Sequence, residues 1–128
     1  MDIAQISPSS WYRVTLGPGE DLFRTMKDFF RKERLREAYV LSCIGSLEKV
    51  VLAYPKTKVL PPEIEKIVIE GLFEINGISG TIKEEAGEIN VHLHGSLSRA
   101  GKEVFGGAII AGTRIFKIAE LVIAGIRE

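Results

Sequence analysis

The clearest alternation of apolar and polar residues along the chain lies in residues 87–98. Apolar side chains there occupy every second position, and the positions between them are polar. The apolar set is Ile89, Val91, Leu93 and Leu97, and the polar set is Asn90, His92, His94, Ser96 and Ser98. A period of two is typical of a strand that buries one face. The pattern therefore predicts a half-buried strand whose polar face carries both histidines of the chain.

A second segment follows the period of a helix instead. The Gly-Pro-Gly sequence at residues 17–19 breaks the preceding strand, and one apolar stripe follows it. The stripe consists of Leu22, Phe23, Met26, Phe29 and Phe30. Acidic residues stand at its start and basic residues near its end, an arrangement that suits the helix dipole. The spacing predicts one amphipathic helix that packs on a sheet.

Nearly all of the remaining chain favours strands joined by short turns, which implies antiparallel neighbours. Asn76-Gly77 is either a hairpin turn or a bulge, so the count is seven or eight strands. Gly106 and Gly107 mark a bend or a close approach of another segment. The predicted strands cover residues 11–16, 38–46, 47–54, 64–75, 78–83, the histidine strand, the Gly-Gly segment and residues 113–123.

One helix cannot cover both faces of such a sheet. The sheet must therefore curl toward a barrel or bury one face against another subunit. The apolar residues Ile109, Ile110 and 121–123 near the C-terminus favour the second solution as well. We expect an α+β protein with a strongly curved antiparallel sheet that assembles as a homo-oligomer.

Composition narrows the class of protein. The chain has 128 residues, which we divide into a tail at 1–10 and one domain at 11–128. Seventeen basic and seventeen acidic residues cancel, so the charge footprint of a stand-alone nucleic-acid binder is missing. We find no membrane span or signal peptide, and the single Cys43, predicted to be buried and inert, suits a reducing cytoplasm.

The two histidines are the candidate site. Their Cα atoms should lie about 6.5 Å apart, at roughly 3.3 Å per residue. Three interpretations stay open: a polar cleft hydrogen-bonded to Ser96, a carboxylate or water; capture of an anion or small molecule; or a weak metal site completed by donors from elsewhere.

Several motifs, in this order, resemble those of the plants and prokaryotes conserved (PPC) domain family. The resemblance spans roughly residues 11–124 and implies a curved antiparallel sheet with a packed helix, similar to the fold of acetolactate decarboxylase. It also implies a homotrimer. The motifs are 41–47 (LSCIGSL), 71–75 (GLFEI), 79–82 (SGTI), 92–94 (HLH), Gly106-Gly107 and 119–123 (AELVI).

The resemblance carries two functional implications. Plant members of the family join this domain to an AT-hook that binds DNA, and this chain has no Arg-Gly-Arg-Pro hook. Many prokaryotic members have a zinc-site pattern, His-x-His followed by Gly-Gly-His. Its first two positions map onto His92 and His94, but Ala108 occupies the third. Glu74, Glu120 or a carboxylate of a neighbouring subunit would have to complete a zinc site.

Glu74 has two interpretations that the sequence leaves open. It pairs with a basic side chain such as Arg114, or it faces the histidines as part of a ligand site. For the whole chain we expect a non-enzymatic homotrimer that is a DNA-associated or regulatory assembly module. The alternative is a binding protein for a small molecule or metal, in which His92, His94, Glu74, Ser96 and Arg114 form the site and the cofactor is at most a weakly bound zinc.

Overall fold

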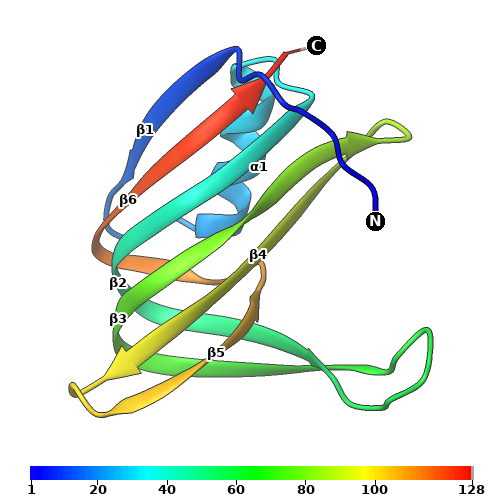
Figure 1. The fold of residues 1–128 in the computed structure, drawn as a ribbon. Coiled ribbons are helices and arrows are strands. Elements are labelled where there is room, and N and C mark those ends of the chain that lie inside the picture. The colour runs from blue at the N-terminus through cyan, green and yellow to red at the C-terminus, as the bar shows by residue number, and fades with distance from the viewer. Residues whose placement is uncertain (128) are drawn as a thin grey trace.

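Six strands and one helix build the fold (Figure 1), in a computed structural model that describes residues 1–127. The strands form one sheet in the order β1-β6-β2-β3-β4-β5, and every pairing is antiparallel. The predicted α+β class and antiparallel sheet are therefore confirmed. In chain order the elements are β1 (Ser10–Leu16), α1 (Leu22–Lys32), β2 (Glu37–Pro55), β3 (Ile64–Glu85), β4 (Glu88–Arg99), β5 (Glu103–Ile109) and β6 (Arg114–Ile126).

The predicted count of seven or eight strands is wrong, because two pairs of predicted strands are continuous. Residues 38–46 and 47–54 both belong to β2, whose register shifts between Gly45 and Leu47 and again between Leu47 and Lys49. Residues 64–75 and 78–83 both belong to β3, with a shift between Ile75 and Gly77. Such bulges bend a strand without ending it. Asn76-Gly77 is thus a bulge and not a hairpin turn.

The bends at these bulges let one half of the sheet, the half that contains β5, close on itself. Besides pairing with β4, β5 pairs with β2 through Leu52 with Ile109 and Ala53 with Ala108. In the same segment the backbones of β4 and β5 approach each other very closely. A Cβ atom on Gly106 would lie 2.0 Å from the carbonyl oxygen of Gly95, so only glycine fits there. The predicted close approach at the Gly-Gly segment is confirmed.

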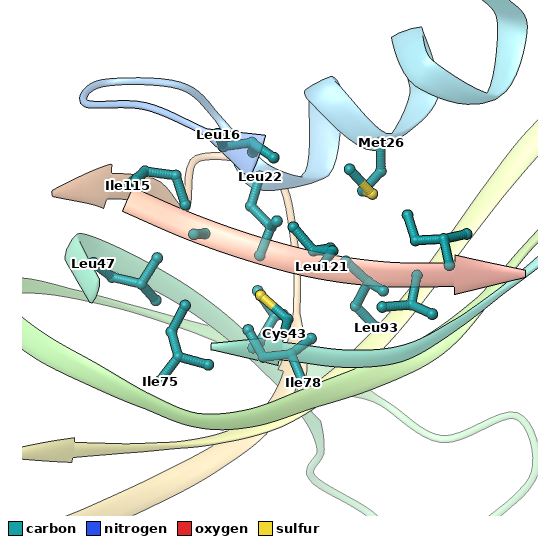
Figure 2. Packing of buried hydrophobic residues seen from close by; sticks show 14 of the residues in the cluster. Leu16, Leu22, Met26, Cys43, Leu47, Ile75, Ile78, Leu93, Ile115 and Leu121 are labelled. Carbon is teal, nitrogen blue, oxygen red and sulfur yellow. The ribbon is translucent and has the colours of Figure 1, made fainter. Parts of the chain in front are cut away.

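Helix α1 covers the inner face of the other half of the sheet. Its Leu22, Met26 and Phe30 are buried, and Figure 2 shows Leu22 and Met26 directed toward the side chains of the sheet, among them Cys43. Cys43 is fully buried, and burial raises the pKa of its thiol to about 12. The side chain of Asp21 accepts a hydrogen bond from the backbone N–H of Arg24 at 3.0 Å and so caps the helix.

The opposite face of β2 and β6 carries large apolar side chains that nothing within residues 1–127 covers, together with the exposed carboxylate of Glu120, the register partner of Ile44. Ile109, Leu121 and Ile123, which we expected to favour subunit contacts, are buried in the core instead. Because alternate side chains of a strand point to opposite faces, it is their neighbours that face outward. We call this surface the outer face; it consists of Leu41, Ile44, Ile118 and Val122, with exposed fractions of 52%, 61%, 43% and 41%.

Among residues 1–127, no helix combines the length and the apolar character that crossing a membrane requires.

Truncating the largest helix side chain in the core tests how far the fold depends on α1. We expect Phe30→Ala to lower the free energy of unfolding by about 3–5 kcal/mol, because it leaves a cavity between helix and sheet. Leu60→Ala is the control, since Leu60 is 96% exposed in the β2–β3 connection. Urea unfolding followed by circular dichroism would measure both; equal midpoints would show that the helix contributes little.

Candidate functional site

His92 and His94 lie on the exposed face of β4, where the alternation of the sequence placed them. Their Nε2 atoms are 3.0 Å apart, and the ring centroids are separated by 4.9 Å. At this distance one ring donates its Nε2–H to the unprotonated Nε2 of the other. The two side chains therefore converge on one point.

The connection between β2 and β3, at residues 54–64 with its flanking ends, projects from the body of the molecule (Figure 1), and we call it the arm. A cleft lies between the arm and the two histidines. We call it the histidine cleft. Its volume is about 270 Å³, and most of its wall is apolar. The hydroxyl of Tyr54 is held by Glu65 at 2.5 Å, and this hydrogen bond raises the pKa of the tyrosine. The lining residues are Ala53, Tyr54, Pro55, Pro62, Ile64, His92, His94 and Ala108.

Ala108 stands directly beside the histidine pair. It is the register partner of His94 on one side and of Ala53 on the other. A methyl group at this position supplies no donor for a metal. Within residues 1–127 no group of three or more His, Cys, Asp and Glu side chains converges on one point. The residues present therefore do not fit a catalytic zinc centre, which needs three protein ligands and an open position.

The other predicted site residues do not join the pair. Ser96 accepts a hydrogen bond from the Nδ2 of Asn76 at 3.3 Å, whereas the side-chain hydrogen bond of His92 is with His94. Arg114 bonds Glu48 through its Nε at 3.1 Å and not Glu74. In the structure Arg114 thus pairs with Glu48, and it does not line the histidine cleft.

Glu74 lies on β3, on the far side of the bulge at residues 75–77. Its register partners are Ser46 and Ser98, and Ser98 is four residues beyond His94 along β4. Glu120, the other carboxylate considered for the pair, lies on β6, whose neighbours in the sheet are β1 and β2. Neither carboxylate lines the histidine cleft, because Glu74 lies five residues along β3 from Ser79, the register partner of His94, and β6 does not pair with β4.

The sequence missed the arm residues that form the opposite wall of the cleft. Tyr54, Pro55, Pro62 and Ile64 were predicted only as strand ends and a loop. The one available signal was the pair of prolines at 61–62, which ends strand pairing and so marks an exposed connection.

Comparison with known proteins agrees with this architecture. Over 113 residues the chain is 31% identical to the bifunctional protein GlmU of a Synechococcus strain; the match covers 88% of the chain but only 17% of that protein. A plant- and prokaryote-conserved (PPC) protein of Pyrococcus horikoshii superposes with a TM-score of 0.85 at 26% identity, over 100% of this chain and 86% of the other.

A more distant structure shares part of the fold. The α-acetolactate decarboxylase of Bacillus subtilis superposes with a TM-score of 0.59 at 13% identity, over 93% of this chain and 53% of that one. At this identity the likeness concerns the fold alone. The model of the Plants and Prokaryotes Conserved (PCC) domain matches residues 5–127, nearly the whole length of the sequence. The chain therefore belongs to the plants and prokaryotes conserved domain family.

Proposed function

We propose that the protein is a non-enzymatic assembly module, in which three copies join through their outer faces. The observation that carries the proposal is the set of four large apolar side chains on β2 and β6 that nothing within residues 1–127 covers. Contiguous exposed apolar surface on a protein commonly marks an interaction site.

The distribution of apolar residues supports self-association over a chance patch. The core already takes the inward side chains of β2 and β6, among them Cys43, Leu121 and Ile123, all fully buried. Apolar side chains at the outward positions as well are what a strand needs when it is covered on both faces. The family resemblance implies three copies, and closed cyclic symmetry would cover every outer face once.

Association with DNA receives less support from the charges. Basic residues near the end of α1 are mixed with acidic ones: Arg31 of the helix lies 3.7 Å from Asp28, and Arg127, which follows β6, lies 3.7 Å from Glu33. With a net charge of zero, few phosphates can be neutralised and few counterions released. The assembly would act by contacts with proteins, and any regulation of DNA would pass through such a partner.

Placing a charge on the outer face tests the assembly. We expect the unmodified protein to have the mass of three chains in size-exclusion chromatography with light scattering at micromolar concentration. Ile44→Asp combined with Val122→Asp should give single chains, because two carboxylates would be buried without partners. Leu60→Asp on the arm is the matched control and should leave the mass unchanged. A single-chain mass for the unmodified protein would refute the proposal.

A gel-shift experiment at low salt tests the expected lack of direct DNA binding. We expect no retardation of an A·T-rich duplex at tens of micromolar protein, since non-specific binding grows with the number of phosphate contacts. A shift that disappears on raising the salt concentration would restore the DNA-associated alternative.

A second candidate function is binding of a small molecule or a weakly held metal in the histidine cleft. The 3.0 Å separation of the two Nε2 atoms favours it, because both nitrogens already point to one position. The apolar walls from the arm would cover the ligand. The missing third ligand argues for a weak site.

Restoring a third imidazole tests the second candidate. In Ala108→His the new ring would start from the register partner of His94, and we expect calorimetry with a zinc salt to show binding at least about a hundredfold tighter than in the unmodified chain. Ala111→His, at an exposed position outside the cleft, is the control. Equal heats for both variants would mean that His92 and His94 are not arranged to hold a metal.

A further inference from the structure

A second cleft lies where the strands bend, away from the histidines. It has a volume of about 390 Å³, within the range of small-molecule sites, and is lined by residues of β2, β3, β4, the β4–β5 turn and β6. The register shifts of β2 at residues 45–49 and of β3 at residues 75–77 flank it. Bulges are common beside binding sites because they redirect side chains. We call it the bulge cleft.

Two opposite charges line the bulge cleft without neutralising each other. Glu74 comes from β3 and Lys117 from β6, and both side chains are exposed. Among residues 1–127, neither takes part in an ion pair or a side-chain hydrogen bond. Arg114 and Glu48 nearby are different, since they pair with each other. The cleft thus offers one carboxylate and one ammonium group to a ligand.

Two serine hydroxyls between the charges retain hydrogen-bonding capacity. Ser46 Oγ accepts a hydrogen bond from the backbone N–H of Lys117 at 3.2 Å, so its proton is available to donate. Ser98 Oγ donates to the side-chain oxygen of Asn76 at 3.3 Å, so its lone pairs are available to accept. One hydroxyl can therefore bond an anionic group and the other a cationic one.

The rest of the wall is apolar and exposed. Leu72 and Phe116 line the cleft with exposed fractions of 61% and 46%. Phe73, which also lines the cleft, is buried, and its ring makes an edge-to-face contact with the ring of Phe105, with 5.6 Å between the two ring centroids. A ligand with an apolar group would cover Leu72 and Phe116 and remove their surface from water.

We propose that the bulge cleft binds a small zwitterion with an apolar group, the chemistry of a free α-amino acid such as leucine or phenylalanine. The ligand's ammonium group pairs with Glu74, its carboxylate with Lys117, and its side chain lies on Leu72 and Phe116. A divalent cation fits less well because only one carboxylate lines the cleft. A polyanion fits less well because one lysine faces it together with a glutamate.

Nuclear magnetic resonance titration of the full chain with L-phenylalanine tests the proposal. We expect amide shifts confined to the residues of the bulge cleft, with binding in the millimolar to micromolar range for so small a ligand. The analogues 3-phenylpropionate, which lacks the ammonium group, and phenethylamine, which lacks the carboxylate, should each bind about tenfold more weakly.

Matched variants separate the site from non-specific binding. Glu74→Gln and Lys117→Met should each weaken binding of phenylalanine by about fivefold to tenfold. Glu88→Gln and Lys58→Met, two exposed charges elsewhere, should not change it. The proposal is overturned if phenylalanine causes no shifts, if both analogues bind as well as the amino acid, or if shifts centre on the histidine cleft. The titration reads out ligand binding and light scattering reads out mass, so failure of this proposal can be told apart from failure of the proposed assembly.

Discussion

A single helix can shield only part of one face of a six-stranded sheet, and this constraint explains most of the structure. Helix α1 buries Leu22, Met26 and Phe30 against the inner face of one half. The other half has no helix and encloses its apolar side chains by pairing β5 with β2. The outer face of β2 and β6 is covered neither by the helix nor by closure of the sheet. Its apolar side chains remain exposed on the single chain, and this remainder is the basis of the proposed assembly.

The two clefts follow from the same bending of the sheet. The continuous strands β2 and β3 change direction at bulges, and Gly106 allows β5 to lie close against Gly95 of β4. The pairing of β4 with β5 sets Ala108 beside His94, and the closure against β2 adds Ala53 next to Ala108, while Glu74 lines the bulge cleft with Lys117 of β6. The two imidazoles and the carboxylate of Glu74 therefore line different clefts and do not form one shared site.

The features that were predictable from the sequence are those encoded by local periodicity. A period of two placed both histidines on one face of β4, and the helical stripe located α1, because each depends only on neighbouring residues. The surroundings of Glu74 and Arg114 could not be read from local periodicity, because they depend on the pairing of strands distant in sequence, which sets Glu74 opposite Ser46 and Ser98 and Arg114 opposite Lys49. The strand count failed for the same reason: glycine and asparagine at 76–77 suit a turn and a bulge equally well.

Hydroxyl-radical footprinting with mass spectrometry at micromolar concentration tests most directly whether copies of the chain cover the outer face. In the single chain Ile44 is 61% exposed and Val59 on the arm is 62% exposed, so their intrinsic accessibility is nearly equal. If the faces join, Ile44 should be labelled several times more slowly than Val59. Equal labelling of the two side chains would contradict the account, since the outer face would then be open to water in solution.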